Sequence, residues 1–277
     1  MTAREALDVA AGELAEAGCA SPRVDAEWLL ADALGVSRSE LHADGTRALT
    51  AEVAGAFRRA VARRAAREPL AYILGEWGFR GLELHVDSRV LIPRPETEAL
   101  VGRSLELLAG IDEPDVLDIG VGSGAIALSI ADEHPGARVV ATDPSTDALA
   151  VAEENRARAG LDRRVELVQG ELFAGLTGPF DLVVSNPPYV DPVDLDALDP
   201  EVRLFEPREA LVATGVTEAI AAGAPDVLVP GGALALEIAD SMAAEIAGAL
   251  DESGYEEVTI TRDLAGRERI VDGRTRR

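Results

Sequence analysis

The chain has 277 residues, of which 47% are hydrophobic and 27% are charged, a composition typical of a soluble protein with one catalytic domain and a smaller companion. No apolar run reaches the roughly 20 residues that a membrane helix requires, and the charged N-terminus lacks the apolar stretch of a secretory signal. The formal net charge of −24 opposes contact with a nucleic-acid backbone. We therefore expect a cytoplasmic protein without a membrane partner or a direct nucleic-acid partner. A monomer is the expectation for its assembly, although nothing in the sequence indicates the oligomeric state.

Metal and disulfide chemistry are not expected. Cys19 is the only cysteine, and the only histidines are His42, His85 and His134. They are not spaced as a ligand pair with one another or with a carboxylate cluster, so no metal ligand is assigned.

The N-terminal part of the chain has the periodicity of helices. Leu7 and Leu14 belong to an apolar set at helical spacing, and Pro22 and Gly35 mark the start and the end of a further helix. This pattern predicts a small helical bundle over residues 1–75.

The next segment, residues 76–95, changes to short alternating runs separated by turn residues. Leu82–Val86 and Val90–Ile92 have the alternation of strands. They predict a β-hairpin that links the helical bundle to the rest of the chain.

Residues 96–277 alternate between strand-like and helical segments, which predicts an α/β domain built on a doubly wound parallel sheet. Two last strands, joined by a short connection, are typical of an antiparallel pair at the sheet edge. The seven predicted strands cover residues 115–120, 138–143, 165–169, 181–185, 233–238, 257–262 and 269–272, and the helices cover residues 123–133, 145–159 and 241–253.

A glycine-rich turn follows the first of these strands. Its three glycines stand at alternate positions, where the absence of Cβ atoms allows a tight turn and close approach of a ligand. The spacing differs from the dinucleotide fingerprint, which favours a cofactor without a pyrophosphate. The residues assigned to the cofactor in this turn are Gly120, Val121, Gly122, Ser123 and Gly124.

Two further positions fit a nucleoside. Asp143 ends the second strand, about 20 residues after the glycines, where a carboxylate can accept hydrogen bonds from ribose hydroxyls. A helix cap is the alternative role, but Ser145 can cap that helix alone. Glu171 and Leu172 follow the third strand and are assigned to the adenine, although an ordinary loop that packs Leu172 into the core explains them equally well.

The fourth strand ends in Asn186-Pro187-Pro188-Tyr189. Two successive prolines remove two N–H donors and stiffen the loop, so its carbonyls are free to accept hydrogen bonds. The two N–H bonds of a substrate amide can be accepted by the Asn186 side-chain oxygen and the Pro187 carbonyl, while the Tyr189 ring packs against the amide plane. We assign Asn186, Pro187 and Tyr189 to catalysis and all four residues to substrate binding.

This loop suits methylation of an amide nitrogen. Such a nitrogen is a poor nucleophile because its lone pair is delocalised into the carbonyl group. Gripping both N–H bonds aims the nitrogen at the sulfonium methyl of S-adenosylmethionine, and placement for in-line attack supplies much of the acceleration.

Several segments, among them Val202-Arg203 with Glu206-Pro207 after the Asn186–Tyr189 loop, give the chain an essentially full-length resemblance to the HemK/PrmC family, which methylates the glutamine of the Gly-Gly-Gln motif in class-1 peptide chain release factors. Val24–Leu30 and Glu68–Gly75 are similar to the family's helical substrate-recognition domain. Leu91–Glu98 resembles its most distinctive linker signature, and the loop Asn186–Tyr189 resembles its catalytic motif.

The resemblance implies a Rossmann-like class I methyltransferase fold with a seven-stranded mixed sheet, S-adenosyl-L-methionine as cofactor and release factors as protein partners. It places the cofactor at the glycine turn, Asp143 and Asn186. Methylation of a ribosomal-protein glutamine and, less favoured, of adenine in nucleic acid stay as alternatives, because related enzymes share the catalytic motif. A non-enzymatic module that binds the cofactor and docks a translation factor is the remaining alternative.

Overall fold

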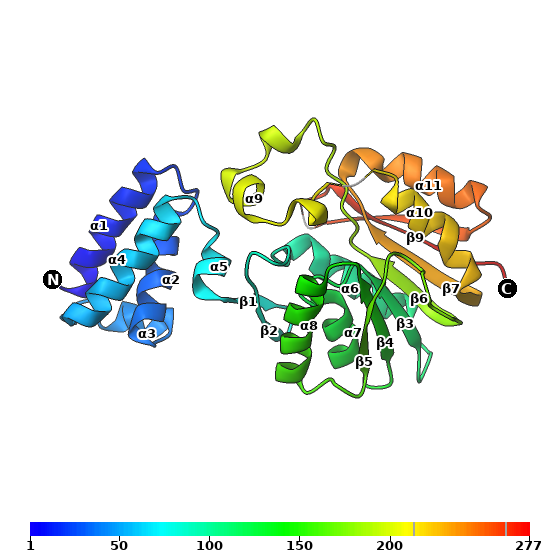
Figure 1. Cartoon of the computed structure of the whole chain (residues 1–277), viewed down its shortest axis with the longest axis horizontal. Helices are drawn as coiled ribbons and strands as arrows, with labels where there is room; N and C mark the ends of the chain where they lie inside the picture. Colours follow the sequence, from blue (N-terminus) through cyan, green and yellow to red (C-terminus); the bar gives the residue numbers. More distant parts are fainter. Residues whose placement is uncertain (213, 264) are drawn as a thin grey trace. The chain divides into compact units, whose positions relative to one another are not determined.

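The computed structural model describes residues 1–212, 214–263 and 265–277. It divides into two compact units (Figure 1). The first comprises Met1–Glu76 together with Leu198–Phe205, and the second comprises Trp77–Ala197 and Glu206–Arg277. The chain therefore leaves the second unit for eight residues, 198–205, shortly after the Asn-Pro-Pro-Tyr loop.

The first unit is a helical bundle. Thr2 begins it with a capping box, in which the Thr2 hydroxyl accepts the Glu5 amide and the Glu5 carboxylate accepts the Thr2 amide. Its apolar core is built largely from buried leucine and alanine side chains together with Phe57 and Val61. The helices are α1 (Ala3–Glu16), α2 (Pro22–Leu34), α3 (Arg38–Ala43), α4 (Ala51–Ala65) and α5 (Leu70–Leu74), joined by α9 (Pro200–Phe205).

A buried ion network holds the segment 198–205 within this unit. Arg64 on α4 donates to Asp25 Oδ2 at 2.8 Å and to Glu201 Oε1 at 2.9 Å. Arg67 also pairs with Glu201. Because Arg64 is buried, its guanidinium depends on both carboxylates for compensation of its charge.

The second unit is built on a seven-stranded sheet of order β5-β4-β3-β6-β7-β9-β8. The five strands from β5 to β7 run parallel, and β9 pairs antiparallel with both β7 and β8. The strands are β3 (Asp115–Ile119), β4 (Arg138–Asp143), β5 (Val165–Gln169), β6 (Phe180–Ser185), β7 (Leu228–Glu237), β8 (Glu256–Arg262) and β9 (Glu268–Arg274). The α/β fold with a seven-stranded mixed sheet and an antiparallel edge pair is thus confirmed.

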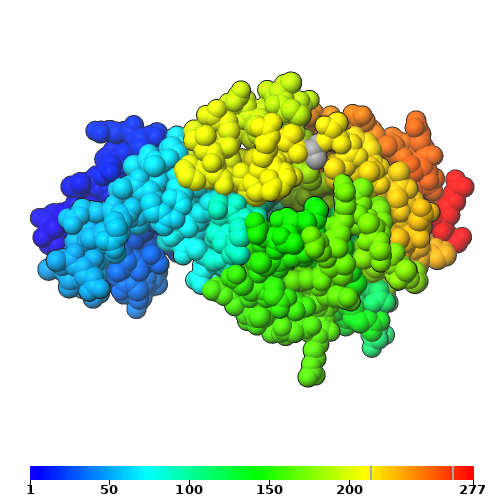
Figure 2. Space-filling view, in the orientation of Figure 1, coloured from blue at the N-terminus to red at the C-terminus, as the bar shows by residue number. Residues whose placement is uncertain are grey.

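Helices cover both faces of the sheet because successive strand residues point to opposite sides. In β3, Val116 joins one core with α6, α7 and α8, whereas Leu117 joins the other core with α10 and α11. The latter two helices form adjoining gold and orange surfaces in the space-filling view (Figure 2). The helices are α6 (Pro95–Leu107), α7 (Ala125–Glu133), α8 (Thr146–Ala159), α10 (Val216–Gly223) and α11 (Ala243–Glu252), with short 3₁₀ turns at Leu195–Ala197, Arg208–Ala210, Ala224–Asp226 and Asp240–Met242.

The predicted hairpin forms from different strands. β1 (Glu76–Phe79) pairs with β2 (Leu82–His85) across the turn Arg80-Gly81. The prediction of a strand at Val90–Ile92 was wrong, because the preceding strand already supplies the partner of β2 and Val90 instead donates to the Asp87 carbonyl in a turn.

Candidate active site

The glycine turn lies between β3 and α7 and has the backbone geometry that its sequence predicts. Gly120, Gly122 and Gly124 have φ values of 81°, 53° and 89°, a left-handed region that residues with a Cβ rarely adopt. The Gly120 and Val121 amides both donate to the Thr142 carbonyl, at 2.8 and 2.9 Å. These bonds fix the turn against the end of β4.

The Asp143 carboxyl group lies beside this turn and is held by two backbone amides. Gly122 N–H donates to Oδ2 at 3.0 Å, and Ser145 N–H donates to Oδ1 at 2.9 Å. Ser145 itself caps α8 by accepting the Ala148 amide at 3.2 Å. Burial raises the pKa of Asp143, whereas the two amide donors lower it. Each carboxyl oxygen keeps a lone pair with which it can accept a ligand hydroxyl.

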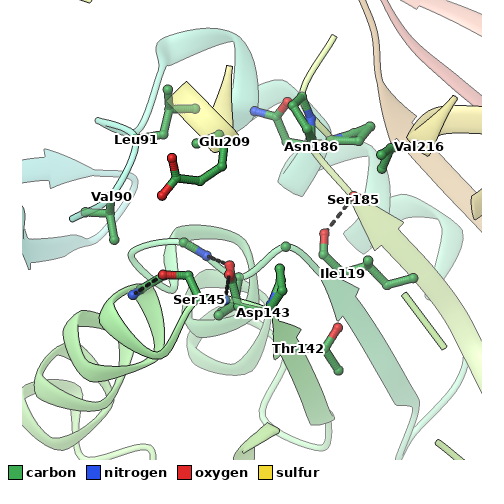
Figure 3. Close-up of a pocket in the computed structure, with 18 of the residues that line it drawn as sticks. Val90, Leu91, Ile119, Thr142, Asp143, Ser145, Ser185, Asn186, Glu209 and Val216 are labelled. Carbon is green, nitrogen blue, oxygen red and sulfur yellow. Dashed lines mark hydrogen bonds between the residues drawn. The ribbon is translucent and has the colours of Figure 1, made fainter. Parts of the chain in front are cut away.

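A cavity of about 480 Å³ opens in front of these groups. Its size is within the range of small-molecule and cofactor sites. Figure 3 shows Asp143, Ser145 and Ile119 on one side and Asn186 and Glu209 on another. The predicted cofactor residues that line it are Gly120, Val121, Gly122, Ser123, Asp143, Glu171, Leu172 and Asn186.

The predicted catalytic loop, Asn186–Tyr189 (called the catalytic loop below), meets the same cavity. Asn186, Pro187 and Pro188 line it directly at the end of β6, next to the glycine turn at the end of β3. The carboxyl ends of parallel strands thus bring the predicted cofactor turn and the predicted substrate loop together.

Gly124 and Tyr189 are not among the lining residues of this cavity. Gly124 instead begins α7, and a Cβ at its position would lie 2.8 Å from Leu128 Cδ1. The Tyr189 hydroxyl turns to Glu237, donating to Oε1 at 3.4 Å. Burial raises the pKa of Tyr189 to about 12, and the neighbouring Glu237 charge adds to the rise.

Several cavity residues were missed by the sequence reasoning. Arg94 and Thr97 come from the start of α6, and Glu209 comes from the 3₁₀ turn after the catalytic loop. Arg94 donates to the buried Glu206 at 2.5 Å. Position 97 lies within the linker signature recognised in the sequence, but no spacing rule indicates that its hydroxyl contacts Asn186.

None of the described helices has the length and apolarity needed to cross a membrane. Across residues 1–212, 214–263 and 265–277, no group of three or more His, Cys, Asp or Glu side chains is placed to hold a metal ion.

The seven-stranded sheet, the glycine turn and the Asn-Pro-Pro loop on one cavity define a Rossmann-like methyltransferase. Family models for the PrmC N-terminal domain and for the methyltransferase small domain match residues 5–75 and 101–202. With 43% identity each, the release factor glutamine methyltransferases of Deinococcus radiodurans and Geobacter sulfurreducens align over 99% of this chain and over 99% and 96% of their own lengths. The chain belongs to the release factor glutamine methyltransferase family, which confirms the resemblance found in the sequence.

Among solved structures, a ribosomal protein L11 methylase from Lactobacillus delbrueckii subsp. bulgaricus is similar in fold. It superposes with a TM-score of 0.51 and 23% identity over 68% of this chain and 82% of its own. At that identity the likeness supports the methyltransferase fold alone.

Proposed function

We propose that this chain transfers a methyl group from S-adenosyl-L-methionine to the side-chain amide nitrogen, N5, of the glutamine in the Gly-Gly-Gln motif of class-1 release factors. One observation carries the proposal: this chain, which is 43% identical over nearly its whole length to relatives named release factor glutamine methyltransferase, has an Asn186-Pro187-Pro188 loop that lines the same cavity as its glycine turn. A cytoplasmic location follows from a substrate that acts in translation.

The residues of the cavity fit the cofactor. The left-handed turn at Gly120 and Gly122 leaves open space where a side chain would otherwise stand, and Asp143 offers two oriented carboxyl oxygens to ribose hydroxyls. Glu171 and Leu172 line the cavity where the adenine is proposed to lie. When bound, S-adenosylmethionine supplies an electrophilic methyl group on a positively charged sulfur.

The loop residues orient the nucleophile. The Asn186 side-chain nitrogen donates a hydrogen bond to Thr97 Oγ1 at 3.2 Å. The Asn186 side-chain oxygen is left to accept a hydrogen bond from the substrate amide. Pro187 and Pro188 have no N–H, so the carbonyls of this turn stay available to a substrate amide. Holding both substrate N–H bonds aims the nitrogen lone pair, and alignment of this kind accounts for much of an enzyme's acceleration. The methylated amide nitrogen is acidic and loses its extra proton to water.

The helical unit is proposed to recognise the release factor, as the match of residues 5–75 to the PrmC N-terminal domain supports. We propose that the enzyme acts as a monomer. The acidic net charge of −24 disfavours nucleic acid as a direct partner.

Methyl transfer from labelled cofactor to a purified class-1 release factor tests the function. The expected result is label on the wild-type factor and none on a factor whose motif glutamine is changed to glutamate, since the glutamate has no amide nitrogen. Equal labelling of both factors would contradict the proposal. Label on a ribosomal-protein glutamine in place of the release factor would favour the alternative substrate.

A further inference from the structure

Two side chains of the catalytic loop, those of Asn186 and Tyr189, each form a hydrogen bond with a buried polar side chain. Asn186 Nδ2 donates to Thr97 Oγ1 at 3.2 Å, and the Tyr189 hydroxyl donates to Glu237 Oε1 at 3.4 Å. Thr97 lies in the first turn of α6, and Glu237 is the last residue of β7. Residues far apart in the sequence thus support one four-residue loop.

The sheet register explains why Glu237 reaches the loop. Ser185, the last residue of β6, pairs with Leu236 on β7. The residue after each of these is Asn186, which directly follows β6, and Glu237, which ends β7. Parallel pairing therefore fixes the carboxyl group beside the catalytic loop.

Burial of the Glu237 carboxyl group is energetically unfavourable. Its side chain is 1% exposed, and Oε2 has no hydrogen-bond partner among the described residues. Burial raises its pKa to about 7, which a hydrogen bond from the Thr97 side chain and the charge of Arg269 oppose. A carboxyl group in such surroundings costs stability, and groups of this kind cluster at functional sites.

We propose that Thr97 and Glu237 are positioning residues that set which end of the Asn186 amide faces the substrate. The inference rests on the proposed function of the Asn186 loop. The Thr97 hydroxyl has one proton, and Glu237 in its ionised form, which prevails above its pKa of about 7, can only accept it. With its proton directed to Glu237, the hydroxyl presents a lone pair to Asn186.

A lone pair selects one end of an amide. The Asn186 side chain can place either its NH₂ or its oxygen toward Thr97, since the two ends have nearly the same shape. Only the NH₂ end can donate to the hydroxyl lone pair, so the oxygen is directed away from Thr97 and toward the substrate. That oxygen is the acceptor that a glutamine amide requires. Through Tyr189, the same carboxyl group also fixes the aromatic ring of the loop.

The experiment compares Thr97→Val, which removes the hydroxyl at constant volume, with Thr97→Ser, which keeps it. We expect Thr97→Val to lower kcat about 10- to 100-fold, because a misdirected amide no longer aligns the nucleophile. Cofactor affinity should change by less than about twofold, and Thr97→Ser should recover most of kcat. Ser104→Ala is the matched control, since it removes a buried hydroxyl on the same helix that donates to the Leu100 carbonyl.

A second measurement does not depend on catalysis. In ¹⁵N-labelled protein, the Asn186 side-chain NH₂ resonances should be shifted and slow to exchange in the wild type and in Thr97→Ser. They should move toward the values of a free amide in Thr97→Val and in Glu237→Gln. Unchanged resonances in Thr97→Val, or wild-type kcat in that variant, would overturn the inference.

A failure of the proposed function is distinguishable from a failure of this inference. If the wild-type chain does not methylate release factors, the substrate assignment is lost while the NMR comparison still decides how Asn186 is oriented. In the kinetic assay, a Thr97→Val/Glu237→Gln double variant should lose little more than the worse single variant, because both act through one amide. If the losses of kcat in the two single variants multiply in the double variant, Thr97 and Glu237 do not act through the same amide.

Discussion

The backbone amide of Gly122 donates a hydrogen bond to Oδ2 of Asp143 at 3.0 Å. The bond joins the turn after β3 to the end of β4, and the left-handed backbone of Gly122 is what directs its N–H at the carboxyl group. The glycine turn and the proposed ribose acceptor are therefore one preorganised unit. A carboxyl group that is already oriented loses little side-chain entropy when it binds a ligand.

Replacement of this carboxyl group should weaken cofactor binding. Asp143→Asn keeps the shape but loses the charge and one acceptor, so we expect the dissociation constant for S-adenosylmethionine to rise about 10- to 100-fold. Calorimetric titration measures it. Asp147→Asn, an exposed acid in the first turn of α8, is the control and should bind normally. Equal affinity in the Asp143 variant would exclude the ribose role.

Removal of the loop amide should separate binding from chemistry. Asn186→Ala loses the acceptor for the substrate amide, so kcat should fall at least about 100-fold, as when one transition-state hydrogen bond is lost elsewhere. The melting temperature should stay near that of the wild type. Single-turnover methyl transfer is the measurement. Retained transfer would show that Asn186 does not grip the substrate, whereas retained release-factor binding without transfer is the expected result.

The parts of the site that the sequence predicts are those in which local chemistry dictates local geometry. Gly120 and Gly122 adopt the left-handed backbone because a turn between strand and helix requires it. Asn186 lies at the carboxyl end of β6, next to β3. Alternating strands and helices build a parallel sheet, and the carboxyl ends of its strands lie along the same edge, where ligands bind.

The missed parts depend on tertiary neighbours. Thr97 looks like an ordinary residue in the first turn of a helix, and Glu237 looks like the polar end of a strand. Only the pairing of β6 with β7 and the packing of α6 bring them to the catalytic loop. Val90–Ile92 was misassigned for a related reason: its composition suits a strand, but β1 already pairs with β2.

Glu209 should help the enzyme distinguish its cofactor from the product. Its carboxylate faces the cavity near Asp143, whose pKa its charge raises (Figure 3). S-adenosylmethionine carries a sulfonium charge that S-adenosylhomocysteine lacks. Glu209→Gln should therefore weaken binding of the cofactor about 3- to 10-fold and leave product binding nearly unchanged. Calorimetry with both ligands checks this, with the exposed Glu218→Gln as control. Parallel weakening of both ligands would exclude charge selection.

Asp118 should make the stability of the chain depend on pH. The side chain is fully buried on β3, where Oδ2 accepts the Ala127 amide at 3.1 Å and burial raises its pKa to about 7. Between its unfolded pKa near 4 and its folded pKa near 7, the native state binds more protons than the unfolded state. This group's contribution to stability therefore falls as the pH rises through that window.

The variant Asp118→Asn removes this titration and keeps an acceptor for Ala127. We expect it to be more stable than the wild type at pH 8 by roughly 2–4 kcal/mol and to lose that advantage by pH 4. Urea denaturation at both pH values measures the difference. An advantage that does not shrink at low pH would mean that the buried carboxyl group is not the cause.

Loss of Asp25 should destabilise the helical unit, because it leaves the buried Arg64 guanidinium with Glu201 as its remaining carboxylate partner. We expect Asp25→Asn to lower the free energy of unfolding of the helical unit by about 2–4 kcal/mol. Removing one partner of a buried ion pair leaves the remaining charge buried and not fully compensated. The matched control is Glu68→Gln, which breaks the more exposed pair with Arg63 on the same helix and should cost less than about 1 kcal/mol.

Tryptophan fluorescence can isolate this unit. Trp28 lies on α2, and Trp77 begins the second unit, so a Trp77→Phe background leaves a reporter in the helical bundle alone. Denaturation curves in that background should shift for Asp25→Asn and hardly move for Glu68→Gln. Equal shifts would show that burial of the Arg64 network does not determine its contribution. A shift for Asp25→Asn alone would show that the buried pair of Asp25 with Arg64 stabilises the folded bundle.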